Sequence, residues 1–205
     1  MKKALLLIDI QNDFMPNGSL GVPFGNEIVS VVNNIIQKFD VIVATQDWHP
    51  KNHGGFASNH PGKKPFEEGS LAGLPQILWP DHCIKGTKGA EFHSDLDTKP
   101  ISAIFRKGTD PKIDSYSGFY DNAKRKSTGL KGYLKEKGIT ELYFTGLAAD
   151  ICVYYSIQDA LEAGFNCIVI EDGVKALDLK KYQQQIKELK EKNVHFVSST
   201  ELKMN

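Results

Sequence analysis

The chain has 205 residues, of which 40% are hydrophobic and 24% charged, an ordinary balance for a globular protein with a sizeable core. Its 25 basic and 25 acidic residues cancel, so no overall field favours nucleic acid or an anionic membrane as a partner. No apolar stretch is long enough to span a bilayer, and three cysteines without regular spacing do not suggest a disulfide framework. These features are typical of a cytoplasmic enzyme-sized domain, and they are compatible with a small neutral substrate.

Short apolar runs alternate with amphipathic segments along the chain. We expect the opening MKKALLLIDIQNDF to form a first strand and not a signal peptide, because its apolar run breaks at Asp9 and no small-residue cleavage site follows. In chain order we predict strand Ala4–Ile8, helix Glu27–Phe39, strands Asp40–Thr45 and Ala103–Phe105, helix Thr128–Lys137, strand Leu142–Thr145, helix Ile151–Ala163, strand Cys167–Ile170, helix Asp178–Lys192 and strand His195–Val197. The first helix would bury one face made of Ile28, Val31, Val32, Ile35 and Ile36.

Strands that alternate with helices predict an α/β fold, a three-layer α/β/α sandwich around a mostly parallel six-stranded sheet. Residues 47–98 break the rhythm with a long irregular segment rich in Gly, Pro, His and Trp, and a loop of that length is usually functional. No repeat or linker divides the chain, so we expect residues 1–205 to form a single domain.

Three predicted strand ends each carry one reactive group, and strand ends are where open parallel sheets bind ligands. Asp9 ends the first strand, where burial would raise the pKa of its carboxyl group. Lys107 follows the strand at 103–105, where an ammonium could stabilise an anion. Cys152 falls in the first turn of a helix with Asp150 as its expected N-cap, and a helix N-terminus lowers the pKa of a thiol. Together they indicate an acid, a cation and a nucleophile at one edge.

Each of these residues also has an ordinary structural interpretation. Asp9 could be a turn-forming aspartate, Lys107 a solvated surface charge, and a free cysteine is most often a small buried apolar residue. Cys167, inside an apolar strand, fits that structural role well, whereas Cys152 occupies the position that a reactive thiol needs.

A metal site is the second hypothesis. Asp47 and His49 are two residues apart, so in an extended segment both side chains point the same way, and His82 could complete the set from a later loop. Two imidazoles and one carboxylate suit Zn, Fe or Mn with positions left open for water or substrate. A surface or structural role is commoner for any single histidine, and His53 could be a ligand, a supporting group or neither.

The motifs in their order resemble the nicotinamidase/pyrazinamidase group of the isochorismatase-like hydrolases. The resemblance covers most of the chain and is carried by LLLIDIQNDFMPNGSL, TQDWHP, WPDHC, RKGTDPKIDSYSGFYDN, GLAADICVYYSIQDALEAG and VIEDGVKA. GxGxxG after the first strand, GxxxxGK[ST], CxxC and GxSxG are all missing, so dinucleotide, P-loop, dithiol and serine-hydrolase chemistry lose support.

This resemblance implies a role for each matching residue. Asp9 would be the general base, Lys107 the lysine of the triad and Cys152 the nucleophile. One divalent ion, expected to be Zn with Fe or Mn as alternatives, would be held by Asp47, His49 and His82. Family members have a cis peptide at the position of Leu147–Ala148, and the amides of Ala148 and Cys152 would form the oxyanion hole. Phe14, Trp79 and Tyr116 match walls of the pyridine pocket, and Leu20 and Tyr155 are further candidates.

The implied reaction is the hydrolysis of nicotinamide to nicotinate and ammonia through a cysteine thioester, in NAD salvage, with pyrazinamide as a second substrate. The sequence is also compatible with a homo-oligomer. One alternative is a related cysteine amidohydrolase that acts on a carbamoyl or ureido substrate. Such relatives generally lack the metal triad and the aromatic pocket. Another alternative is a non-catalytic metal-binding or scaffold protein with an unreactive Cys152.

Overall fold

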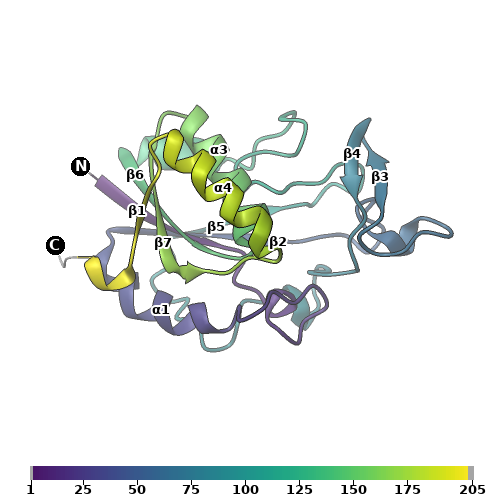
Figure 1. The fold of residues 1–205 in the computed structure, drawn as a ribbon, viewed down its shortest axis with the longest axis horizontal. Helices are drawn as coiled ribbons and strands as arrows, with labels where there is room; N and C mark the ends of the chain where they lie inside the picture. The colour runs from purple at the N-terminus through teal and green to yellow at the C-terminus, as the bar shows by residue number, and fades with distance from the viewer. Residues whose placement is uncertain (1, 203–205) are drawn as a thin grey trace.

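The computed structural model describes residues 2–202, and a six-stranded parallel sheet runs through its centre (Figure 1). The spatial order is β5-β2-β1-β6-β7-β8. The strands are β1 (Lys2–Ile8), β2 (Val41–Asp47), β5 (Ala103–Lys107), β6 (Ile139–Gly146), β7 (Asn166–Val174) and β8 (His195–Val197). The predicted α/β fold with its six-stranded sheet is confirmed.

The central position of β1 follows from its composition. Residues 4–8 are all apolar and fully buried, as expected for a strand covered on both faces. The chain leaves β1 towards β2 and β5 on one side and later returns to β6 on the other. Strand order therefore reverses beside β1, and such a reversal opens a crevice at the carboxyl ends of the strands.

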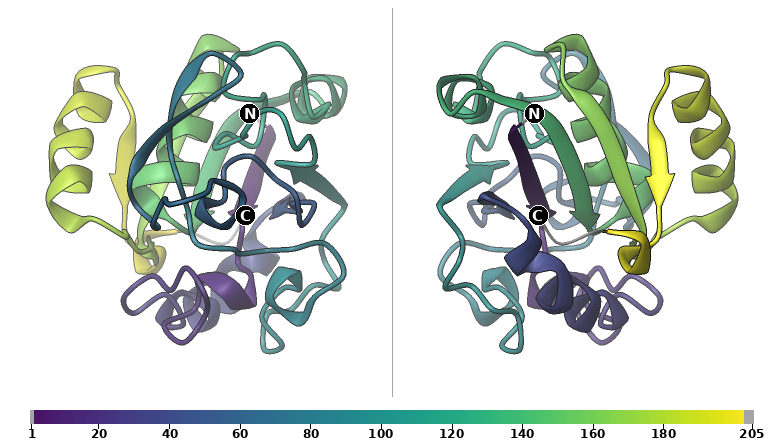
Figure 2. Two further views of the ribbon diagram at one scale, coloured as in Figure 1. Left: turned by 90° about the vertical axis from the view of Figure 1, so that its right-hand side faces the viewer. Right: turned by 90° about the vertical axis from the view of Figure 1, so that its left-hand side faces the viewer.

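Helices cover both faces of the sheet. Figure 1 shows α1 (Glu27–Ile35) on one side and α3 (Tyr154–Glu162) and α4 (Leu179–Glu191) on the other, and Figure 2 shows α2 (Leu130–Glu136) on the side of α3. Short helical turns are η1 (Asn12–Phe14), η2 (Ile36–Lys38), η3 (Ala57–Asn59), η4 (Lys88–Ala90), η5 (Ala149–Val153) and η6 (Ser199–Glu201). Among residues 2–202, no helix is both long and apolar enough to cross a bilayer.

Several predicted helix bounds are wrong, for local reasons. The helix expected over Glu27–Phe39 ends at Ile35 and continues as the tighter turn η2, and it buries Val29 where Val31 was expected, which is half-buried. The helix expected from Thr128 begins at Leu130, because Gly129 has a left-handed φ of 94°. The helix expected from Ile151 begins as a π-helical turn, η5, before α3.

The long segment at 47–98 is irregular for most of its length but contains a hairpin that the sequence analysis missed. Strands β3 (Glu68–Leu71) and β4 (Leu74–Ile77) pair antiparallel and lie away from the main sheet (Figure 1). Their two-residue turn has positive φ at both Ala72 and Gly73, 55° and 79°, which matches the right-handed twist of paired strands.

Candidate active site

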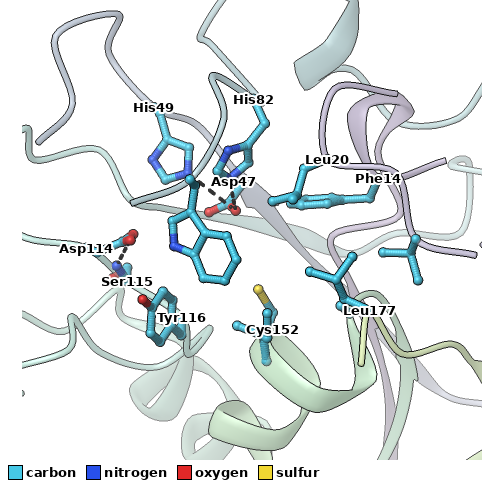
Figure 3. Close-up of a pocket in the computed structure, with 14 residues that line it drawn as sticks. Phe14, Leu20, Asp47, His49, His82, Asp114, Ser115, Tyr116, Cys152 and Leu177 are labelled. Carbon is cyan, nitrogen blue, oxygen red and sulfur yellow. Dashed lines mark hydrogen bonds and ion pairs between the residues drawn. The ribbon is translucent and has the colours of Figure 1, made fainter. Parts of the chain in front are cut away.

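A pocket lies at the carboxyl ends of the central strands (Figure 3). Phe14 comes from the turn after β1, Asp47 ends β2, and Cys152 belongs to η5 after β6. Residues that are far apart in the sequence meet here because parallel strands all end at one edge.

Asp9 immediately follows β1 and is fully buried, in a left-handed conformation with φ of 48°. Its Oδ1 accepts a hydrogen bond of 2.6 Å from the hydroxyl of Thr45. Burial raises the pKa of the Asp9 carboxyl group, while the positive charge of Lys107 opposes that rise. The net result is a carboxylate with more affinity for a proton than an exposed aspartate has.

Lys107 is the last residue of β5 and the electrostatic centre of the site. Its Nζ donates to Asp47 Oδ1 at 2.7 Å, to the carbonyl of Ser115 at 3.1 Å and to Cys152 Sγ at 3.5 Å. Asp9 Oδ2 lies 2.9 Å from Nζ as an ion pair. Burial disfavours the charge of Lys107, but the carboxylates of Asp47 and Asp9 raise its pKa well above the usual value, so it stays an ammonium.

Cys152 presents its sulfur to the pocket, as Figure 3 shows. Its Sγ and carboxylate oxygens of Asp9 and Asp47 all lie within 4.8 Å of one another. Burial raises the pKa of the Cys152 thiol well above its usual value, with Lys107 acting in the opposite direction and Asp9 adding to the rise. The expectation of a lowered pKa at a helix start is therefore wrong, and the resting thiol needs a base to remove its proton.

Asp150 does not cap the helix as expected. Its carboxylate reaches instead across to the loop before α4, accepting hydrogen bonds from the amides of Leu177 at 2.8 Å and Asp178 at 3.3 Å. The turn that carries Cys152 is thus tied to a second loop that lines the pocket.

The chain has an unusual peptide bond just before the turn η5 that carries Cys152. The peptide between Leu147 and Ala148 is cis, as the resemblance implied. Ala148 lines the pocket, and among residues 2–202 no acceptor pairs with its amide hydrogen. That free donor, close to Cys152, is suited to receive a developing oxyanion.

Asp47, His49 and His82 converge as the sequence predicted. His49 Nε2 lies 3.4 Å and His82 Nε2 3.8 Å from Asp47 Oδ2 (Figure 3). The Nδ1 atoms pair with backbone carbonyls, of Gly108 at 2.9 Å for His49 and of Pro80 at 2.8 Å for His82. With Nδ1 bonded to the backbone in this way, both Nε2 atoms face the carboxylate, which is the arrangement of histidines that ligate a metal. These side chains fit a divalent cation.

His53 lies beside this triad but is oriented differently. Its ring centroid is 4.4 Å from that of His49, and its Nδ1 accepts a hydrogen bond of 3.1 Å from the amide of Gly55. Burial lowers the pKa of His53 to about 4, so the ring is neutral and its proton sits on Nε2. Together with His49 and Asp114 it forms a second group whose potential ligand atoms lie within 4.8 Å of one another.

Aromatic side chains form the walls. Phe14, Trp79 and Tyr116 all line the pocket, as does Leu20. Tyr155 is not among the lining residues. It packs against Tyr116, with ring centroids 5.4 Å apart, and is 40% exposed.

Other residues at the site were not predicted from the sequence. Val22, Asp114, Ile151 and Leu177 also line the pocket. Leu177 follows β7, so the strand-end rule could have found it. Asp114 had no such signal, because it sits in an irregular loop after β5.

Comparison with known proteins places these features in a family. The isochorismatase domain matches residues 3–201. The chain is 46% identical to the nicotinamidase of Escherichia coli over 182 residues, which cover 87% of this chain and 85% of that protein. It is 49% identical to the nicotinamidase of Acinetobacter baylyi over 176 residues, covering 86% and 82% of the two chains.

Solved structures agree with the sequence relatives. A nicotinamidase/pyrazinamidase from Acinetobacter baumanii is 44% identical and matches with a TM-score of 0.95, covering 98% of both chains. A protein from L. infantum, solved in complex with nicotinate, is 35% identical with a TM-score of 0.86 and coverage of 97% and 93%. A pyrazinamidase of Pyrococcus horikoshii, solved in complex with zinc, is 34% identical with a TM-score of 0.79 and coverage of 97% and 99%.

Proposed function

The chain belongs to the isochorismatase domain family, and from that membership we propose that it is a nicotinamidase, which hydrolyses nicotinamide to nicotinate and ammonia and also deamidates pyrazinamide. One observation supports this above all. Cys152 lines an aromatic pocket together with three side chains that fit a metal ion, and the buried carboxylate of Asp9 and ammonium of Lys107 lie beside its sulfur.

The first step is transfer of the thiol proton of Cys152 to Asp9. Burial raises the pKa of the Asp9 carboxyl group, so Asp9 is a stronger base than an exposed aspartate. Burial also raises the pKa of the Cys152 thiol, which is why the thiol needs that base. Lys107 keeps its positive charge and stabilises the thiolate as it forms, through the 3.5 Å contact between Nζ and Sγ. The sulfur then attacks the carboxamide carbon of the substrate.

The second step expels ammonia. The amides of Ala148 and Cys152 donate to the oxygen that becomes negative in the tetrahedral intermediate. Asp9 returns its proton to the leaving nitrogen, the C–N bond breaks, and a thioester remains on Cys152. Asp9 is then a carboxylate again and can deprotonate the water that attacks the thioester, which releases nicotinate and restores the thiol.

The pocket walls select a flat ring. Phe14, Trp79 and Tyr116 offer aromatic faces and edges against which a pyridine ring can pack. The amide of such a ring would point to Cys152. A substrate with only a carbamoyl or ureido group would leave this aromatic surface uncovered, which favours the pyridine amide.

We propose that Asp47, His49 and His82 hold zinc, with Fe or Mn as the other metals that suit these ligands. When bound, the ion supplies a Lewis acid that orients the substrate ring and ordered water. The two backbone contacts at Nδ1 keep both imidazoles in the tautomer that can ligate.

Two further proposals concern the chain as a whole. We propose that residues 1–205 form one catalytic domain, since strands from both ends of the chain share the central sheet. We also propose a cytoplasmic location, which three free cysteines favour.

An ammonia-release assay with nicotinamide tests the function. Wild-type protein should release ammonia, Cys152→Ala should be essentially inactive, and Cys167→Ala should keep most of the activity because Cys167 lies within β7, away from the pocket lining. Release of ammonia from a carbamoyl compound but not from nicotinamide would favour the related amidohydrolase instead. Full activity of Cys152→Ala would refute the mechanism.

A further inference from the structure

Gln11 makes an unusual set of contacts with Asp47. The side chain of Gln11 is fully buried just after β1. Its Oε1 accepts a hydrogen bond from the amide of Asp47 at 2.8 Å, and its Nε2 donates to the carbonyl of the same residue at 2.8 Å. Nε2 also donates to the carbonyl of Ala90 at 2.8 Å. One carboxamide thus holds both backbone groups of Asp47.

The geometry of a parallel sheet explains why such a clamp is needed. β1 pairs with β2 only as far as Leu7 and Ala44, and the chain leaves the sheet at Asp9. β2 continues to Asp47, so its last residues have no partner strand on the edge that faces β1. The amide of Trp48 donates to Lys107 on β5, which means that the alternate residue, Asp47, faces the side that β1 has left.

We propose that Gln11 is a positioning residue that takes the place of the missing strand and fixes Asp47. A carboxamide carries the same donor and acceptor as a peptide group, so it can complete the ladder for one residue. Without it, the amide and carbonyl of Asp47 would be buried and unpaired.

The position of Asp47 matters because its two carboxylate oxygens serve different partners. Oδ1 accepts from Lys107 at 2.7 Å, and Oδ2 faces His49 and His82. A rotation or shift of Asp47 would therefore disturb the proposed metal site and the catalytic ammonium together. The assignment of Gln11 rests on the proposed function, and in particular on a metal bound by this triad.

Gln46 provides a matched control. It is also a buried glutamine beside Asp47, and its Nε2 donates to the same carbonyl of Ala90, at 2.9 Å. Its Oε1 accepts from Arg106 at 3.1 Å, and it makes no side-chain bond to the backbone of Asp47. Replacing Gln46 removes comparable buried hydrogen bonds but leaves the clamp intact.

The experiment measures zinc affinity and turnover together. Wild type, Gln11→Met and Gln46→Met are stripped of metal and titrated with Zn²⁺ in competition with a chromophoric chelator, and kcat for nicotinamide is measured at saturating Zn²⁺. We expect Gln11→Met to bind Zn²⁺ about 10- to 100-fold more weakly, as for lost supporting contacts in other metal sites, and to have a lower kcat. Gln46→Met should bind Zn²⁺ within about twofold of wild type, because these supporting contacts are unchanged.

A second variant covers the case in which Gln11→Met does not fold. Gln11→Asn keeps the carboxamide but is one methylene shorter, so it cannot make both bonds to Asp47, and its zinc affinity should also fall. Wild-type zinc affinity in the folded Gln11 variants, or an equal loss in Gln46→Met, would overturn the assignment. A wild-type protein that releases ammonia but binds no Zn²⁺ would overturn the metal site and this assignment, and leave the cysteine mechanism standing.

Discussion

At the scale of single residues, burial decides the resting charges of the site. Asp47 has a pKa well below the usual value, because the charges of Lys107 and His49 outweigh the effect of its burial. Asp9 has a raised pKa and Cys152 a strongly raised one, and burial is the largest cause in both. In the resting site Asp47 is therefore a carboxylate, Lys107 is an ammonium, and Cys152 is a thiol whose proton Asp9 can accept.

Selective alkylation tests the reactivity of Cys152. Its side chain lines the pocket beside a base, whereas Cys83 and Cys167 are buried elsewhere. Burial raises the pKa of Cys167 to about 12, so at pH 8 roughly one molecule in ten thousand carries its thiolate. We expect iodoacetamide at pH 8 to modify Cys152 at least tenfold faster than Cys167, as followed by peptide mass mapping.

Two controls sharpen this measurement. Nicotinate, as a ligand of the pocket, should slow the modification of Cys152 and leave Cys167 unaffected. The rate at Cys167 should rise about tenfold per pH unit towards pH 12, because the thiolate fraction rises in that way. Equal rates at the two cysteines at pH 8 would mean that Cys152 is not activated.

The sequence predicted these reactive residues because each follows an apolar strand. Asp9, Lys107 and Cys152 required only the strand assignment and the rule that parallel strands end at one edge. The bonds of Asp150 could not be predicted, because an aspartate at a helix start looks like a cap whichever group its carboxylate reaches. The net pKa of Cys152 depends on burial depth, which no local pattern encodes.

At the scale of elements, the hairpin β3–β4 supports one wall of the pocket through Gln76. The Nε2 of Gln76 donates to Asp114 Oδ2 at 2.8 Å and to the hydroxyl of Tyr116 at 3.2 Å. Gln76→Leu would leave the buried carboxylate of Asp114 with one partner fewer and free the Tyr116 ring. We expect KM for nicotinamide to rise about tenfold, a loss of about 1.4 kcal/mol in binding, with a smaller change in kcat.

Glu68→Gln is the matched control for this hairpin. Glu68 lies on β3 opposite Ile77, and its side chain is exposed, so the substitution should leave KM unchanged. Steady-state kinetics on both variants decide the matter. If Gln76→Leu keeps the wild-type KM, the hairpin does not support the pocket wall through Gln76.

Asp150 connects the turn η5 to the loop before α4. Asp150→Ala leaves the amides of Leu177 and Asp178 without their acceptor, and bonds to a charged group are the stronger kind. We expect a loss of about 3 kcal/mol in the free energy of unfolding, measured by urea denaturation. Asp178→Ala removes an N-cap bond to the amide of Lys181 and should cost only about 1 kcal/mol. Equal losses of unfolding free energy in the two variants would contradict the role of Asp150 in joining η5 to the loop before α4.

Element bounds show where local sequence stops being informative. The central strands were predicted because their apolar runs are long and uninterrupted. The hairpin was missed because its strands have four residues each and mix Gly, Pro and polar side chains. The start of α2 was missed because Gly129 is compatible with a helix until its actual φ is known.

At the scale of the whole molecule, the sheet brings together residues from distant parts of the chain, and residues 47–98 complete the site from outside it. Asp47 and His49 lie at the end of β2, while His82 returns from beyond the hairpin. The stretch between His49 and His82 contains the hairpin β3–β4 and one short helical turn, η3, and is otherwise irregular. A metal held by both ends would close this loop.

Metal binding should therefore stabilise the folded protein. At a free Zn²⁺ concentration a hundred times the Kd, linkage predicts about 2.7 kcal/mol, which for a chain of this size raises Tm by roughly 5–10 °C. Differential scanning fluorimetry of metal-stripped protein, with and without Zn²⁺, measures this shift. His82→Ala should abolish it, because the distant end of the loop then loses its ligand.

His60→Ala is the appropriate control for that shift. His60 lies in the same segment, and its Nε2 contacts the carbonyl of Gly54 at 2.7 Å, outside the triad. Its replacement is expected to lower Tm in both conditions and to preserve the difference that Zn²⁺ makes. An equal zinc shift in His82→Ala would mean that the ion binds elsewhere, and the loop would then owe its order to packing alone.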